Sequence, residues 1–203
     1  FRFDSVLGIP GIVNAARIGN VTIANAVGNG VADDKAVYPY VPDMIAYYLD
    51  ETPILPNVDT YDLQDPDQCQ YVLDRVDRMV LKPSDASGGY GLVIGTKATD
   101  EELLEVSRKV QANPRGWIAQ PVVTFSTYPT AMDDGTLEAR HVDLRPFAVN
   151  SGDEIYVLPG GLTRVALKPG SIIVNSSQGG GTKDTWVLDD GGNENGAMKE
   201  SGQ

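Results

Sequence analysis

The segment around Lys82 constrains the fold of this chain more than any other. Residues 79–82 form an apolar run that predicts a strand, and residues 92–94 predict a second strand returning beside it. The intervening residues 83–91 are rich in serine and glycine. Because glycine lacks a Cβ, its backbone N–H groups can approach a phosphate closely, and a nearby lysine adds positive charge. The pattern predicts a phosphate-binding hairpin, with a tight surface hairpin and an exposed lysine as the alternative.

The order of elements around this loop excludes two common nucleotide-binding motifs. Dinucleotide and Walker motifs place their glycine-rich loop between a strand and a helix, whereas here the loop joins two strands. Their spacings, Gly-x-Gly-x-x-Gly and Gly-x4-Gly-Lys-Ser/Thr, are absent from the sequence. The chain is therefore neither a Rossmann protein nor a P-loop protein.

Two helices have clear start signals. Asp65 followed by Pro66 is typical of a helix start, and this helix is expected to run to about Arg75. Thr99 with Glu102 three positions later predicts a capping box, and the residues that follow carry an apolar stripe.

The remaining segments complete a strand-rich pattern. Residues 36–49 predict a helix in which Pro39 and Pro42 either lie at the beginning or force a break. Residues 189–203 are rich in glycine, asparagine and glutamate and predict a disordered tail. The further strands expected are residues 20–28, 117–123, 141–149, 154–158, 162–167 and 171–174. With three or four helices, the pattern predicts the α+β class.

The composition narrows the chemistry that the chain can perform. It has 16 Lys and Arg against 28 Asp and Glu, a net charge of −12, which repels phosphate backbones and argues against a nucleic-acid partner. Cys69 is the single cysteine and His141 the single histidine, which excludes a disulfide framework and clustered Cys/His metal sites. An enzyme built from this inventory depends on lysine, arginine, carboxylates, asparagine and backbone N–H groups.

The apolar runs and the first residues of the sequence indicate where in the cell the protein is expected. No run approaches the roughly 18 apolar residues of a membrane span, so no membrane partner is expected. The first residues lack the features of a signal peptide, which predicts a cytoplasmic protein. Because the sequence begins without a methionine, we expect a fragment of a longer protein or a trimmed chain.

Two further segments carry candidate functional residues. Asp143 and Arg145 alternate on a predicted strand and Arg164 lies on the next but one, so the charges either face a cleft or form a buried ion pair. Asn175 precedes the run Gly179-Gly180-Gly181, which predicts a loop closing over an anion, with a flexible surface loop as the alternative. His141 is expected to be structural, although its neighbour Asp143 leaves a role at the site open.

Together, these segments resemble the ATP-grasp ligases. Val80-Leu81-Lys82-Pro83-Ser84 with Ser87-Gly88-Gly89-Tyr90-Gly91 resembles their second-lysine strand and glycine loop, and Asp34-Lys35 resembles their first lysine. Gln120-Pro121-Val122-Val123 stands where the family's hinge receives adenine on backbone groups. Asp143-Leu144-Arg145, Arg164 and Asn175 with its glycine run resemble elements of glutathione synthetase and ribosomal-protein glutamate ligases.

One departure points to a particular branch of that superfamily. The classical enzymes follow the Asn and Gly-Gly element with a Glu-x-Asn strand that holds magnesium, whereas here Glu194-Asn195 lies in the predicted tail. The circularly permuted ATP-grasp type 2 family, which is similar to glutathionylspermidine synthase, carries its metal strands upstream of the first lysine. The resemblance extends from residue 1 to about residue 188 and includes His141-Val142-Asp143-Leu144-Arg145-Pro146-Phe147.

The resemblance implies an ATP-dependent ligase that joins a carboxylate to an amine through an acyl phosphate, using ATP and Mg2+. It implies two small α+β subdomains with a nucleotide cleft between them, and segments at residues 1–77, 78–124, 125–188 and 189–203. The resemblance also implies that this is the C-terminal part of a longer chain and that the metal ligands lie upstream of it. The chain alone is therefore expected to bind ATP weakly or unmeasurably. A non-catalytic ATP-binding module and an ATP-grasp phosphotransferase are the alternatives.

The resemblance also assigns residues to roles. The residues expected to bind ATP are Lys35, Lys82, Ser87, Gly88, Gly89, Tyr90, Gly91, Gln120, Pro121, Val122, Val123 and Asp143. The catalytic residues expected are Arg145 and Arg164, which would stabilise the transferring phosphoryl group, and Asn175, which would close on the intermediate and exclude water. Those expected to bind substrate are Gly179, Gly180, Gly181 and Lys183. Asp143 is expected either to orient Arg145 or to reach the ribose.

Overall fold

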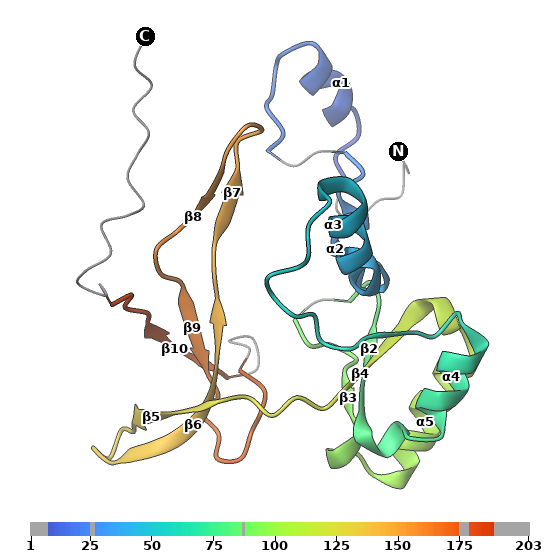
Figure 1. Ribbon diagram of the computed structural model, residues 1–203, viewed down its shortest axis with the longest axis vertical. Helices are drawn as coiled ribbons and strands as arrows, with labels where there is room; N and C mark the ends of the chain where they lie inside the picture. Colours follow the sequence, from blue (N-terminus) through green and yellow to red (C-terminus); the bar gives the residue numbers. More distant parts are fainter. Residues whose placement is uncertain (1–7, 25–26, 87, 175–178, 189–203) are drawn as a thin grey trace. The chain divides into compact units, whose positions relative to one another are not determined.

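The strands of the chain form antiparallel sheets in two separate units, residues 1–122 and 123–203. The computed structural model describes residues 8–24, 27–86, 88–174 and 179–188 (Figure 1). The mixture of helices and antiparallel sheets is the α+β class expected from the sequence. The division of the chain at residues 77, 124 and 188, and the nucleotide cleft, stay predictions.

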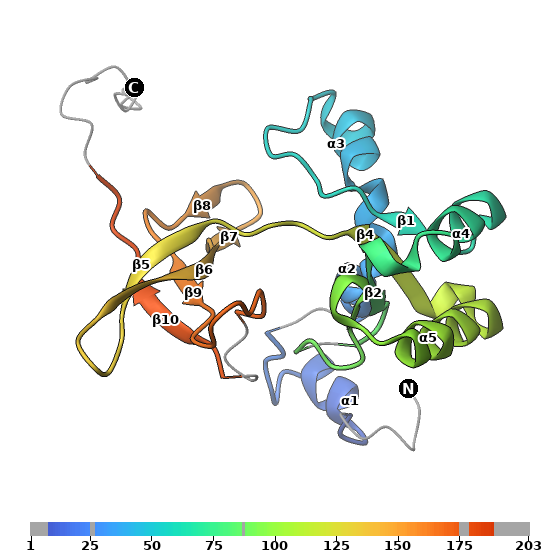
Figure 2. The same cartoon turned by 90° about the horizontal axis from the view of Figure 1, so that it is seen from below.

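The first unit contains a four-stranded sheet in the order β1-β4-β2-β3, with every neighbouring pair antiparallel. Three of its strands, β1, β4 and β2, are labelled in Figure 2. Its strands are β1 (Tyr61–Asp62), β2 (Met79–Pro83), β3 (Val93–Ile94) and β4 (Trp117–Pro121). Its α-helices are α1 (Ile12–Arg17), α2 (Gly30–Asp33), α3 (Val41–Leu49), α4 (Pro66–Leu73) and α5 (Asp100–Ala112). Short 3-10 helices are η1 (Lys35–Tyr40), η2 (Val76–Arg78), η3 (Gly95–Lys97) and η4 (Pro114–Gly116).

The hydrophobic core lies between one face of this sheet and helices α4 and α5. Leu81 of β2 and Ala119 of β4 are fully buried, as are Val72 of α4 and Val106 and Val110 of α5. Successive side chains on a strand point to opposite faces of its sheet. The side chains next to this buried set therefore project from the other face, which is where the candidate site lies.

The helix start signals are confirmed. The Asp65 carboxylate accepts from the backbone N–H groups of Asp67 and Gln68 at 2.9 and 3.0 Å. Helix α4 ends at Leu73, slightly before the predicted Arg75. At the start of α5 the reciprocal capping box is complete, because the backbone N–H of Glu102 donates to Thr99 Oγ1 and that of Thr99 donates to Glu102 Oε2.

In the first unit one local prediction is wrong, one helix was not predicted, and one of two alternatives is confirmed. Residues 20–24 form no strand, and Val21 and Ile23 are exposed, because no described strand pairs with this short apolar run. Residues 25–26 of the same prediction lie outside the described residues. The helix α1 was not expected. The predicted helix at residues 36–49 divides into η1, which contains Pro39, and α3, in which Pro42 occupies the first turn.

The second unit has a four-stranded sheet in the order β10-β9-β6-β5 and a separate β7–β8 hairpin. Its strands are β5 (Thr127–Ala131), β6 (Leu137–Arg145), β7 (Ala148–Asn150), β8 (Ile155–Val157), β9 (Leu162–Val165) and β10 (Gly181–Asp184). The predicted strand at residues 141–149 is interrupted at residues 146–147, where Pro146 has no N–H to donate.

Three predictions for the second unit also need correction. β5 was not expected, and residues 171–174 are not a strand. Gly181 begins the edge strand β10, opposite Val165 of β9, so the predicted closing loop is at this point part of the sheet. The predicted tail at residues 189–203 lies outside the described residues. No helix in the described ranges is long and apolar enough to cross a bilayer.

Gly95 generates the first prediction. A Cβ at this position would lie 2.1 Å from the backbone oxygen of Val76, so the Gly95→Ala variant must displace η2. We expect this overpacking to lower the free energy of unfolding by about 1–3 kcal/mol, measured by urea denaturation. The matched control is Gly30→Ala, because a Cβ there meets nothing within 4 Å. Equal midpoints for the two variants would contradict the expectation.

Candidate functional site

Two lysines line one cavity in the first unit. This cavity has a volume of about 700 Å³, and its wall includes Lys35 at the start of η1 and Lys82 of β2. Both lysines also line a neighbouring cavity of about 420 Å³, beside the loop between β2 and β3. The structure thus brings together the two lysines that the sequence placed in separate segments.

Lys82 is held by a side chain from the adjacent strand. It lies opposite Ile118 in the β2–β4 pair, and its ammonium donates to Gln120 Oε1, on the same face two residues further along β4. Gln120 Nε2 in turn donates to Thr60 Oγ1 at 2.7 Å. Because the NH2 group of the Gln120 amide donates to Thr60, the amide oxygen of Gln120 faces the Lys82 ammonium. Gln120 therefore has a side-chain role that sequence reasoning missed.

The environment of Lys82 disfavours its charge. Burial lowers the pKa of this lysine, and the positive charge of Lys35 lowers the pKa further. Two ammonium groups on the wall of one cavity repel each other, and an anion bound between them would relieve that repulsion. The repulsion between the two ammonium groups therefore favours a negatively charged ligand, although Asp33 and Asp34 line the same cavity.

One backbone and one side-chain hydrogen bond connect Lys35 to the segment that follows Lys82. The Lys35 N–H donates to the Ser84 carbonyl oxygen at 3.0 Å, and its ammonium donates to the Ala86 carbonyl oxygen. One residue earlier, Asp34 Oδ1 accepts from the Ala36 N–H at 2.9 Å and caps η1. The turn that carries Lys35 is thus hydrogen-bonded to the segment that immediately follows β2, the strand that carries Lys82.

Arg115 completes this arrangement and was not identified from the sequence. Its guanidinium pairs with the Asp34 carboxylate and holds the pKa of that carboxyl below its usual range. The two residues are 81 positions apart in the chain, so no local pattern connects them. The strand register accounts only for the contact between Arg115 and Ser84, because Pro83 lies opposite Trp117 and this places residues 84 and 115 at one end of the sheet.

The loop between β2 and β3 needs glycine. Gly88, Gly89 and Gly91 have φ values of +67°, +77° and +72°, a region that residues with a Cβ rarely adopt. Gly88, Gly89 and Tyr90 line the smaller cavity. Ser87, predicted to belong to the same loop, lies outside the described residues. The glycine loop therefore lies beside the lysines, as the sequence predicted, with its role still to be tested.

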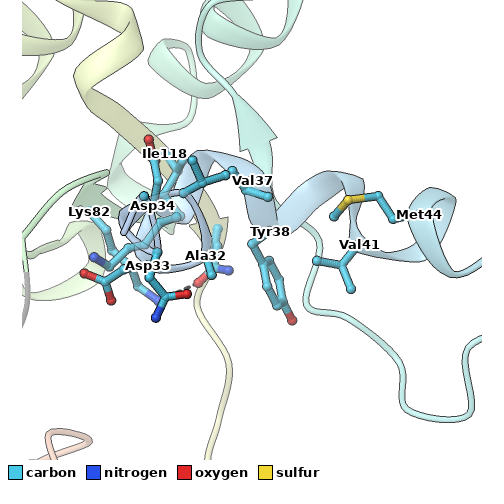
Figure 3. Close-up of a pocket in the computed structure, with 14 residues that line it drawn as sticks. Ala32, Asp33, Asp34, Val37, Tyr38, Val41, Met44, Lys82 and Ile118 are labelled. Carbon is cyan, nitrogen blue, oxygen red and sulfur yellow. Dashed lines mark hydrogen bonds between the residues drawn. The ribbon is translucent and has the colours of Figure 1, made fainter. Parts of the chain in front are cut away.

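The larger cavity has one charged end and one apolar end. Asp33 and Lys82 cluster at one end, and Val41 and Met44 of α3 lie at the other, with Tyr38 between them (Figure 3). Such a cavity suits a ligand with an anionic end and a flat or apolar end.

The predicted adenine hinge is only partly at this cavity. Gln120 lines it, and Gln120 and Pro121 belong to β4, opposite Val80 and Met79. Residue 122 is half-buried, and Val123 is 44% exposed at the start of the second unit. Binding of adenine by residues 120–123 stays a prediction.

In the second unit, Asp143 pairs with Arg164 and not with Arg145. The two residues lie opposite each other in the β6–β9 pair, where Arg164 Nε donates to Asp143 Oδ1 at 2.8 Å and Nη2 donates to Oδ2. This fork raises the pKa of Arg164 above its ordinary value. Arg145 is exposed on the same face, two residues along β6. The prediction that Asp143 orients Arg145 is therefore wrong.

Lys183 lies on the opposite face of that sheet. It pairs with Thr163, the neighbour of Arg164, and alternation along β9 separates the two cations. Its ammonium donates to the Pro129 carbonyl oxygen at 3.2 Å and lies 5.7 Å from the ring centroid of Tyr128. Lys183 therefore faces away from Arg164, and its expected role in binding substrate stays a prediction.

Four other predicted residues remain to be placed. His141 Nδ1 lies 2.8 Å from the Phe125 carbonyl oxygen, an arrangement that fits a structural residue. Gly179 and Gly180 precede β10, and Gly179 has a φ of +83°. Asn175 lies outside the described residues, so its role stays a prediction. Among the described residues, no group of three or more His, Cys, Asp and Glu side chains is arranged to hold a metal ion.

Comparison with known proteins gives a family and several relatives. A family model described as circularly permuted ATP-grasp type 2 matches residues 1–166. The chain is 61% identical over 188 residues to an uncharacterized protein of Mycobacterium tuberculosis, covering 93% of this chain and 34% of that protein. It is 54% identical over 188 residues to an uncharacterized protein of Synechocystis, covering 93% and 39%.

A third relative has a more specific name. The chain is 55% identical over 181 residues to a Frankia casuarinae protein named "Putative glutamate--cysteine ligase 2-2", covering 89% of this chain and 21% of that protein. The chain thus spans well under half of the length of the curated relatives it matches.

The repulsion between the two lysines gives a prediction. Replacing Lys35 with methionine removes one source of the lowered Lys82 pKa, so the pKa of Lys82 should rise in Lys35→Met, although burial still lowers it. The measurement is an NMR pH titration of the Lys82 side chain. The matched control is Lys109→Met, whose ammonium pairs with Glu105 on α5. A Lys82 titration curve that both variants leave unchanged would show that the two lysines do not interact.

The Asp34 carboxylate gives a second prediction. Arg115 lowers the pKa of Asp34 in the folded chain below the value in the unfolded chain. The pair therefore stabilises the fold at pH values above the unfolded pKa, and this stabilisation is lost as the pH falls through the folded pKa. Asp34→Asn should therefore be less stable than the parent chain at pH 7, and the difference should shrink below about pH 4. Urea denaturation across this range measures it, and a difference independent of pH would contradict the prediction.

Proposed function

Because the chain belongs to the circularly permuted ATP-grasp type 2 family, we propose that it is the nucleotide-binding part of an ATP-dependent ligase that joins a carboxylate to an amine. The observation that carries the proposal is the meeting of Lys35 and Lys82 on one cavity wall, beside a loop of glycines with positive φ. Neither the two separate lysines nor the loop alone would carry it.

The cavity fits the two ends of ATP. Lys35 and Lys82 would bind the α- and β-phosphates, whose negative charge offsets the repulsion between the ammonium groups. The loop at Gly88 and Gly89 would cover the phosphates with backbone N–H groups. The apolar end, formed by Val41 and Met44 with Tyr38, would receive the base.

The reaction that follows from the family is two successive displacements. ATP supplies its γ-phosphoryl group to a substrate carboxylate, which yields an acyl phosphate and ADP. The amine then attacks the acyl carbon and loses a proton, and phosphate leaves. Arg145 and Arg164 of the second unit would stabilise the charge on the phosphoryl group, with Asp143 holding the Arg164 guanidinium in a fixed plane. Asn175, with Gly179 and Gly180, would shield the intermediate from water.

Magnesium and the substrates are also part of the proposal. ATP-grasp enzymes use ATP with Mg2+, and the resemblance places the metal ligands in strands that the family carries upstream of the first lysine. The Frankia relative is named as a glutamate–cysteine ligase. We therefore propose an amino-acid or peptide carboxylate as the acceptor of the phosphoryl group and an amino group as the nucleophile.

Binding of MgATP tests the first half of the proposal. NMR titration of the 203-residue chain reads affinities into the millimolar range, so it also detects weak binding. Each lysine would contribute a charge-assisted hydrogen bond worth about 1.5–3 kcal/mol, so Lys35→Met and Lys82→Met should each weaken binding by about tenfold or more. The control Lys109→Met, on α5, should bind like the parent chain. Unchanged affinity in both cavity variants would overturn the assignment of these lysines.

Product analysis tests the second half. The full-length Mycobacterium tuberculosis relative would be incubated with MgATP, amino acids and hydroxylamine, which traps an acyl phosphate as a hydroxamate. A hydroxamate or an amide, formed together with ADP and phosphate, supports the ligase. A stable phosphoester would identify a phosphotransferase, and nucleotide binding without turnover would identify a non-catalytic module. Either of these outcomes would replace the proposal.

A further inference from the structure

Arg115 connects three segments that are distant in sequence. It lies on η4, immediately before β4, and its guanidinium forks onto both oxygens of Asp34, with Nη1 at 3.5 Å from Oδ1. The same Nη1 lies 3.5 Å from Ser84 Oγ, and Ser84 Oγ donates to the Arg115 carbonyl oxygen at 3.3 Å. Arg115 thus contacts the residue before Lys35 and the segment that follows Lys82.

The segment after Lys82 is anchored on both sides. Ser84 is 4% exposed, and its N–H donates to the Gly116 carbonyl oxygen at 2.9 Å. Its own carbonyl oxygen accepts from the Lys35 N–H. A displacement of the turn at Arg115 would therefore reach Lys35 by two routes, through Asp34 and through Ser84.

The contacts of Arg115 oppose the electrostatic repulsion between Lys35 and Lys82. Lys35 and Lys82 carry like charges on one cavity wall, and their repulsion would favour moving the turn that carries Lys35 away from β2. The Asp34–Arg115 fork opposes this displacement through a planar, two-point contact, which lysine cannot reproduce. Around the guanidinium, Asp62 and Asp85 add further negative charge.

We propose that Arg115 is a positioning residue of the nucleotide site, which sets the spacing of Lys35 and Lys82 by holding Asp34 and Ser84 together. The inference rests on the proposed function, since it gives the two lysines their role on phosphates. Arg115 does not touch the ligand in this scheme. It orders the site before the ligand arrives, so its loss acts on affinity by removing preorganisation.

The test compares variants of the 203-residue chain by NMR titration with MgATP. Arg115→Met should weaken binding by about tenfold, and Arg115→Lys should fall between this variant and the parent chain because one contact replaces the fork. The matched control is Arg108→Met, which removes an exposed arginine from α5. Urea denaturation of each variant identifies the folded ones, and Arg115→Lys serves if Arg115→Met does not fold.

A second measurement separates positioning from general stability. If Arg115 holds Lys35 near Lys82, then Arg115→Met should raise the pKa of Lys82, whereas Arg108→Met should not. The double variant Asp34→Asn/Arg115→Met should lose no more affinity than the more damaging single variant, because both changes break the same bridge.

The outcomes distinguish this inference from the proposed function. A parent chain that shows no MgATP binding contradicts the proposed function for this chain, and the Lys82 titration still decides whether Arg115 positions Lys35. If the parent chain binds MgATP and Arg115→Met binds equally well with an unchanged Lys82 titration, the proposed role of Arg115 is overturned. Additive losses in the double variant would overturn it as well.

Discussion

The repulsion between Lys35 and Lys82 is the constraint on which the site depends. Two ammonium groups on one wall destabilise each other, so the chain must hold them together by other bonds. The structure uses a backbone hydrogen bond from Lys35 to Ser84, a side-chain amide on Lys82 and an ion pair on Asp34. Of these groups, Lys82 and Gln120 project from the face of the sheet opposite the core. The repulsion favours the binding of an anion at this site.

Because successive side chains on a strand point to opposite faces of the sheet, one face of the sheet carries core residues and the other carries residues of the candidate site. Leu81 faces helices α4 and α5 and is fully buried, while Lys82 beside it faces the cavity. The same rule divides the second unit, where Arg164 and Lys183 point to opposite faces although their strands are adjacent. A prediction that collects charged residues into one cleft therefore needs the register of the strands as well as their order.

The features that could be predicted from the sequence are those set by residues close together in the chain. The Asp65 and Thr99 caps, the β2 strand and the glycine loop follow from spacings of a few residues, and the structure contains them all. The failures have a common cause. Residues 20–24 look like a strand but have no described partner, Gly181 looks like a loop but pairs with β9, and Arg115 finds Asp34 across the fold. Pairing over long separations is decided by tertiary structure, which a single sequence does not show.

The lowered basicity of Lys82 has a consequence beyond ligand binding. A lysine with a lowered pKa keeps a larger fraction of its side chain as the free amine at neutral pH, and the free amine is the nucleophile. Lys82 should therefore react with amine-directed acylating reagents that fit the cavity more readily than a surface lysine such as Lys109 does. A ligand bound in the cavity would shield Lys82 from such reagents. The rate of Lys82 acylation would therefore report whether the cavity holds a ligand.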